Sequence, residues 1–211
     1  MVEFKKIKKI KKIKMHIEGF ERFDKKFESV LETAEWKKLE QDFKTSKRIF
    51  LVGNGGNLAV CDHGAIDIAR LTNKSSAAPG SGILASSLIN DTGHQNWVKN
   101  WLQICLRGLN SEHIEESLII GVSSSGYSKN ICLALEYAQS KSCKAALISA
   151  NVPKIEGSYN TILLGVNQYH TSEVLTLALI YQLIHSAGFS CPSIEASSNK
   201  NDKVIDYALR E

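Results

Sequence analysis

The sequence lacks the features of secreted and membrane proteins. Its five cysteines are scattered, odd in number and form no C-x-x-C pair: Cys61, Cys105, Cys132, Cys143 and Cys191. This pattern is typical of reduced thiols, so we expect a cytoplasmic protein in which most cysteines fill the core. No run approaches 18 uninterrupted apolar residues, and we therefore expect no transmembrane helix and no membrane partner.

Positive charge is also scarce once the first residues are set aside. The formal net charge is +4, but residues 1–14 hold seven lysines and one glutamate, so the rest of the chain carries about −2. The body has no basic field for nucleic acid, and we expect no such partner. Residues 1–15 are interpreted as a flexible basic leader, 16–190 as one domain and 191–211 as a polar tail.

Three common nucleotide and hydrolase motifs are missing. No G-x-x-x-x-G-K-[ST] occurs, which excludes a P-loop nucleotidase. Leu58 stands where a dinucleotide fingerprint after Gly53-x-Gly55 needs glycine or alanine. Ser125 stands where a nucleophile elbow needs its second glycine, so an α/β-hydrolase is not expected.

The sequence does contain a strand, a glycine turn and a helix in direct succession. The apolar run 49–52 predicts a buried strand, the turn Gly53-Asn54-Gly55-Gly56 permits positive φ, and Asn57 suits the N-cap of the next helix. Free N–H groups at the positive end of a helix dipole favour an anion, most naturally a phosphate.

The remaining pattern predicts an α/β protein with a parallel sheet. Continuous apolar runs indicate strands that are buried on both faces, and they alternate with amphipathic stretches. We expect helices at 17–45, 129–141 and 171–187, a helix carrying Trp97 and Trp101, a short one within 204–211, strands at 117–122, 144–150 and 161–166, a weak strand at 82–85, and loops at 73–80 and 88–93.

Three polar loops fall where the sheet should end. In an open parallel sheet, ligands bind outside the carboxyl ends of the strands. The loops are 53–57, 90–93 and 123–128, and the last carries Ser123, Ser124, Ser125 and Ser128. Hydroxyl and backbone donors at a helix N-terminus suit a phosphate, and together with the glycine loop they favour a small phosphorylated metabolite over a merely structural serine loop.

The succession strand–GNGGN–helix, LINDTG and strand–SSSGYS–helix resembles the sugar isomerase (SIS) domain, most closely its phosphoheptose isomerase group. The resemblance covers about residues 20–188. It implies a three-layer αβα sandwich with a five-stranded parallel sheet, preceded here by a long N-terminal helix. It also implies a homotetramer, or a dimer, with sites at subunit boundaries.

The resemblance further implies roles for particular residues. The four serines would surround the phosphate of a sugar, and Gly55 would approach it. Asn54, Asn57 and Asp91 would face the sugar hydroxyls. In the family, a glutamate four residues after a histidine moves a proton between carbons through an enediol, and these positions are His63 and Asp67 here.

The second half of the family's catalytic set has changed. When Glu173 is aligned with the glutamate of the last helix, the family's glutamine becomes Ser172, assigned here to the substrate site, and its histidine becomes Ile180. His170 and His185 do not share a helix face with position 180. Some relatives bind zinc with this set, but His63 and Asp67 alone underfill a zinc site, so we expect no cofactor, with zinc at these two as the other possibility.

Two functions follow. The first is a phosphosugar isomerase resembling sedoheptulose 7-phosphate isomerase. The alternative is a non-catalytic phosphosugar-binding protein with a regulatory or scaffold role, like a replication-initiator-associated relative in the group. The loops together with His63 and Asp67 favour the first function, and Ser172 and Ile180 favour the second.

Overall fold

The computed structural model describes residues 17–153 and 157–192. The basic leader, most of the C-terminal tail and the expected short helix within 204–211 lie outside these residues. Within them the elements run α1 (Phe23–Leu31), α2 (Ala34–Thr45), β1 (Arg48–Val52), α3 (Gly56–Leu71), β2 (Ser75–Ala77), α4 (Gly82–Thr92), α5 (Trp97–Leu106), α6 (Ser111–Glu115), β3 (Ser117–Val122), α7 (Lys129–Ser140), β4 (Lys144–Ser149), β5 (Asn160–Leu163) and α8 (Tyr169–Ser186).

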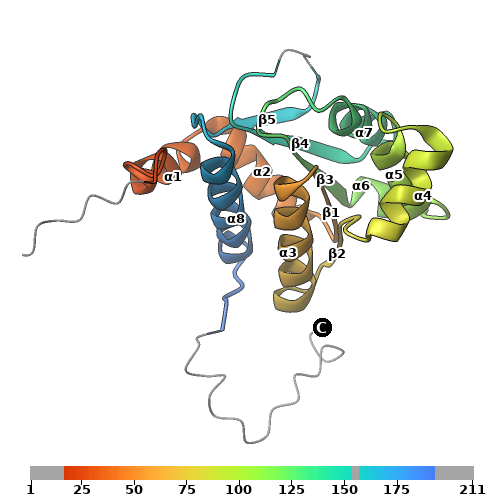
Figure 1. Ribbon diagram of the computed structural model, residues 1–211. Helices are drawn as coiled ribbons and strands as arrows, with labels where there is room; N and C mark the ends of the chain where they lie inside the picture. The colour runs from red at the N-terminus through yellow and green to blue at the C-terminus, as the bar shows by residue number, and fades with distance from the viewer. Residues whose placement is uncertain (1–16, 154–156, 193–211) are drawn as a thin grey trace, which may run out of the picture.

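The five strands form one parallel sheet in the order β2-β1-β3-β4-β5. The predicted α/β class and five-stranded parallel sheet are thus confirmed. Figure 1 shows α3 and α8 side by side on one face of the sheet and α4, α5 and α7 on the other. None of the helices in the described ranges is long and apolar enough to cross a membrane.

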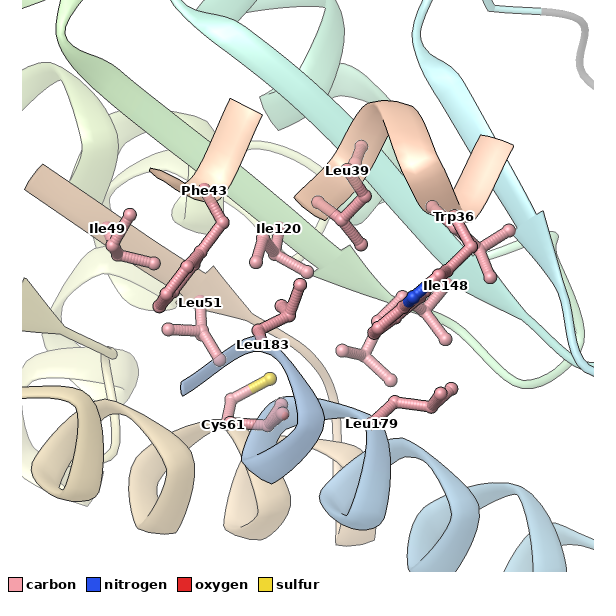
Figure 2. Close-up of a cluster of buried hydrophobic side chains, with 14 of the residues drawn as sticks. Trp36, Leu39, Phe43, Ile49, Leu51, Cys61, Ile120, Ile148, Leu179 and Leu183 are labelled. Carbon is pink, nitrogen blue, oxygen red and sulfur yellow. The ribbon is translucent and has the colours of Figure 1, made fainter. Parts of the chain in front are cut away.

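Strand side chains alternate between two cores. Ile49, Leu51 and Ile120 enter the core beneath α2, α3 and α8, which Figure 2 shows with Trp36 and Leu183. Phe50 and Val52 point the other way, into the core beneath α5 and α7. Cys61, Cys132 and Cys143 are buried, as expected of core fillers, and all five cysteines are free.

The expected single helix at 17–45 is wrong. Two helices occur instead, and Thr33 separates them by adopting an extended backbone and accepting a hydrogen bond from the Trp36 amide at 3.1 Å. Threonine caps a helix in this way without disturbing the apolar periodicity on either side. The apolar spacing therefore continues across the break between α1 and α2, and it could not predict that break.

The stretch between α3 and α5 is also corrected. The expected loop at 73–80 contains the edge strand β2, which pairs with β1 through Ser75 and Arg48. The expected strand at 82–85 and turn at 88–93 are the two ends of α4, whose N-cap is Ser81. Two serines and an alanine make a strand here because β1 offers a free edge, which local sequence does not encode.

Candidate functional site

The glycine and serine loops lie side by side at the carboxyl edge of the sheet. They follow β1 and β3, which are neighbours, with Val52 opposite Gly121. The side-chain amides of Asn54 and Asn130 exchange two hydrogen bonds, of 3.0 and 2.8 Å, and so join the first loop to the start of α7. The parallel sheet thus brings together two predicted loops that are about 70 residues apart in the chain.

The serine loop is held in a tight turn by its own hydroxyls. Ser123 donates through Oγ to Ser128 Oγ at 2.9 Å, and Ser125 Oγ accepts from the Tyr127 amide at 3.2 Å. Gly126 has φ of 72°, and a Cβ there would lie 3.0 Å from Ser149 Oγ, so only glycine fits without a shift. The loop leads into α7, whose first N–H groups have no helical acceptor.

A buried hydrogen-bonded group links three elements behind the loop. The Asn57 amide donates to Ser124 Oγ at 3.1 Å, and the Ser124 hydroxyl lies 2.9 Å from Ser172 Oγ on α8. All three residues are buried. Asn57 is not the N-cap predicted for it: Gly55, with φ of 54°, is the N-cap, and Asn57 lies in the first turn of α3.

Ser124 and Ser125 line a cavity of about 100 Å³. Its other walls are Ala150, Asn151, Asn167, Gln168 and Tyr169, from the chain after β4 and the approach to α8. These amide side chains are not among the site residues predicted from the sequence. They follow two further strands of the sheet, so the rule that selected the serine loop could also have found them.

Asp91 does not join this group. It is an exposed residue in the last turn of α4, and its carboxylate accepts a hydrogen bond from the Asn90 amide at 3.2 Å. Figure 1 shows α4 beyond α5, on the opposite face of the sheet from α3 and α8. The predicted strand and turn around Asp91 are wrong, because residues 82–92 form helix α4. Contact between Asp91 and a sugar hydroxyl stays a prediction.

His63 and Asp67 form a second cluster, one helical turn apart on α3. His63 Nε2 lies 3.3 Å from Asp67 Oδ2, and their side chains are 57% and 9% exposed. Tyr181 of α8 donates to Asp67 Oδ2 at 2.6 Å, and His63 Nε2 lies 2.9 Å from the Tyr181 oxygen. Because the phenol proton is given to Asp67, this contact requires a proton on Nε2.

Arg70 completes the cluster by donating to Asp67 Oδ1 at 3.0 Å. Both carboxylate oxygens of Asp67 therefore accept a hydrogen bond. Burial and the hydrogen bond to Asp67 raise the pKa of Tyr181 to about 12, so the phenol remains a donor at neutral pH. A hollow of about 380 Å³ opens beside Asp67, Arg70 and Tyr181.

The cluster and the serine loop are separated along α3. Asp67 lies ten residues after Asn57, which at 1.5 Å per residue is about 15 Å along the helix. In one copy of the chain the carboxylate is therefore remote from the cavity at the serine loop. The arrangement provides hydroxyl and amide groups at one position and an imidazole with a supporting carboxylate at the other.

Zinc does not fit the residues present. Ile180 has no atom that can ligate a metal, and its side chain is fully buried. It packs against α3 so closely that a Cβ on Gly64 would lie 2.8 Å from Ile180 Cδ1. Ser172 accepts a hydrogen bond from Ser124 of the serine loop. Within 17–153 and 157–192, no group of three or more His, Cys, Asp or Glu side chains could hold a metal. His170 stacks on Phe20, away from the cluster.

Comparison with known proteins supports the resemblance read from the sequence. The phosphoheptose isomerase of Buchnera aphidicola is 29% identical over 114 residues, which are 54% of this chain and 58% of that protein. The chain thus spans less than two thirds of this curated relative. No family model matches the chain.

Solved structures agree on the fold. A phosphoheptose isomerase from Neisseria gonorrhoeae superposes with a TM-score of 0.62 at 16% identity, covering 79% of this chain and 91% of that one. One from Francisella tularensis gives 0.63 at 13% identity, covering 80% and 93%. The chain therefore has the fold of the sugar isomerase (SIS) domain, and its sequence is similar to the phosphoheptose isomerase group within it.

Proposed function

We propose that the protein is a phosphosugar isomerase that interconverts sedoheptulose 7-phosphate and an aldoheptose 7-phosphate in the cytoplasm. The observation that carries the proposal is the joining of the serine loop to α3 and α8 through Asn57, Ser124 and Ser172. Three elements thereby hold hydroxyl and amide groups at the edge of the sheet where parallel folds bind ligands. The sequence similarity to a phosphoheptose isomerase supports the same substrate class.

The phosphate would be bound at the N-terminus of α7. Ser125 is half-buried and faces the cavity, and Ser128 is the N-cap of the helix. Serine hydroxyls and backbone N–H groups bind a phosphate dianion without a lysine clamp, because the helix dipole supplies the favourable field. Asn151, Asn167 and Gln168 would contact the oxygens nearest to the phosphate.

The proton would be moved by His63, with Asp67 behind it. Asp67 is buried and bound by Arg70 and Tyr181, so its carboxylate is a poor acceptor for a carbon-bound proton. His63 is exposed, and with Nε2 donating, its Nδ1 is the nitrogen that can accept a proton. This exchanges the roles that the resemblance implied, in which the carboxylate was the base.

A second copy of the chain would complete the site. His63 lies six residues after Asn57, about 9 Å along α3, and Asp67 lies about 15 Å along it, so the cluster of one copy is displaced from its own serine loop. A homotetramer or dimer with sites at subunit boundaries, as the resemblance implies, would let a neighbouring copy supply the missing part.

Turnover with sedoheptulose 7-phosphate tests the proposal. We expect measurable isomerisation in the unmodified protein, reduced about 10²–10⁴-fold in His63→Gln and at least tenfold in Asp67→Asn. Ser125→Ala/Ser128→Ala should weaken substrate binding at least tenfold, because each lost hydrogen bond to a charged group costs about 1.5–3 kcal/mol. Ser140→Ala, at the exposed end of α7, is the matched control and should change neither quantity.

The same experiment decides the alternative function. The engagement of Asp67 by Arg70 and Tyr181, with isoleucine at position 180, favours a binding protein without turnover. Binding of the sugar phosphate by the unmodified protein, lost in Ser125→Ala/Ser128→Ala but without any isomerisation, would establish the binding role. Unchanged turnover in His63→Gln would contradict the assignment of the proton-transfer group.

A further inference from the structure

A second hollow lies at the amino edge of the sheet, opposite the sugar loops. It has a volume of about 350 Å³, within the range of small-molecule sites. It is lined by the C-terminal end of α2, by the segment between α3 and β2 and by the residues that follow α8. Its polar lining includes Lys44, Lys47, Asn73 and Lys74, and Phe189 forms an apolar wall.

Lys74 is the buried member of this group, with an exposed fraction of 7%. Its ammonium donates to the carbonyl oxygens of Lys44 at 3.2 Å and Ser46 at 2.6 Å. It also lies 5.2 Å from the ring centroid of Phe43. Among the described residues no carboxylate pairs with it. A buried cation without an opposite charge is costly, so a neutralising partner would be favourable.

Other cations converge on the same place. Lys144 donates to Thr45 Oγ1 at 2.9 Å and to Ser46 Oγ at 3.3 Å, both on residues of the hollow. Lys47 and Arg48 share one carboxylate, Glu116, at 2.6 and 3.6 Å. Lys44 is exposed and makes no ion pair within the described ranges.

Helix dipoles offset only part of this charge. α2 and α8 end at the hollow, and each helix C-terminus carries about half a negative charge. The two ends together therefore balance about one of the lysines. With Glu116 shared between Lys47 and Arg48, a positive excess remains around a cavity that also offers hydroxyl and amide groups.

We propose that this hollow is a second anion site, which takes a small molecule carrying a phosphate group. Lys44 and Lys74 would contact the phosphate oxygens, and Phe189 would pack against the organic part. The site is separate from the serine loop, because the two lie at opposite ends of the parallel strands. Both can therefore be occupied in one molecule.

The test uses the full chain carrying Ser125→Ala/Ser128→Ala, which weakens the first site, and titrates it with inorganic pyrophosphate in a calorimeter. We expect one binding event per chain. Lys44→Gln in that background should weaken it about tenfold, because the variant loses a charge-assisted hydrogen bond to the anion. Lys38→Gln, on the same helix but away from the hollow, should leave the affinity within twofold.

Lys74→Gln removes the hydrogen bonds of Lys74 to the carbonyl oxygens of Lys44 and Ser46 and would disturb the end of α2. The test therefore relies on Lys44→Gln. No binding heat at millimolar pyrophosphate would overturn the proposal. Binding that Lys44→Gln leaves unchanged would also overturn it and would assign the anion to other charges, such as the seven lysines of residues 1–14. An equal loss in Lys38→Gln would show non-specific attraction and would equally refute a built site.

Discussion

Tyr181 holds the hydrogen-bonding position that a second acid or base would need beside Asp67. Sequence comparison aligned Ile180 with the family's histidine, and the structure shows that the next residue reaches the carboxylate instead. Ile180 points into the core against Gly64. Replacing it by histidine would therefore bury an imidazole among apolar side chains, and would not restore a catalytic pair.

The pKa of Tyr181 gives a prediction for alkaline pH. The ordinary pKa of tyrosine is about 10, and the folded value is about 12, so the native state holds this proton more tightly than the unfolded state. The contribution of Tyr181 is present below pH 10 and is lost as the pH rises from 10 to 12. In thermal melts, Tyr181→Phe should be less stable than the unmodified protein at pH 8, by about 1–2 kcal/mol.

The stability difference between the two proteins should narrow between pH 10 and pH 12, because phenylalanine has no proton to lose. A difference that stays constant over that interval would contradict the hydrogen bond between Tyr181 and Asp67. Comparing the two proteins at each pH removes the effect of groups common to both.

At the scale of elements, the contact between α3 and α8 positions both clusters. Gly64 permits it: a Cβ there would lie 2.8 Å from Ile180 Cδ1 and 3.1 Å from its Cγ2. The same helix pair brings Ser172 to Ser124 at one end and Tyr181 to Asp67 further along. A change in the spacing of the two helices would therefore disturb both sites.

Gly64→Ala should accordingly destabilise the protein by about 1–3 kcal/mol, although alanine has the higher helix propensity. Ile180→Val removes the Cδ1 that the new methyl group would meet. The double variant should therefore be more stable than the sum of the two single changes predicts, which chemical denaturation measures as a coupling free energy. Additive effects would show that the two side chains do not collide.

At the scale of the molecule, the two ends of the sheet differ in character. The carboxyl end carries hydroxyl and amide loops, and the amino end carries lysines. Apolar side chains also remain exposed outside both ends, including Ile66 at 66%, Ile83 at 84% and Val174 at 46%. Exposed side chains of this size on α3, α4 and α8 favour association between copies.

We therefore expect a symmetric homo-oligomer, most simply a tetramer, in light scattering at micromolar concentration. Ile66→Asp should reduce the measured mass, because a buried unpaired carboxylate is costly at an interface. Gln41→Asp, on the exposed face of α2, is the comparison variant with the same added charge, because α2 carries none of these apolar side chains. A monomeric mass for the unmodified protein would contradict both the assembly and the shared site proposed above.

Local sequence was sufficient for much of this protein. Apolar runs located β1, β3 and β4, and glycine and serine clusters located the two loops, because strand burial and turn chemistry depend on a few adjacent residues. The parallel topology followed from the alternation of strands and helices. The pairing of the two loops then followed from the rule that parallel strands end at one edge.

Only the tertiary structure decided the rest, since it depends on partners that are distant in the chain. Residues 75–77 become a strand because β1 has a free edge, and Thr33 ends one helix pattern and starts another without altering its period. Asp67 received its partner Tyr181 from a helix 114 residues away, through packing that no local spacing specifies. The hollow lined by Lys44 and Lys74 arises in the same way, because helix ends and strand starts from three parts of the chain meet at the amino edge of the sheet.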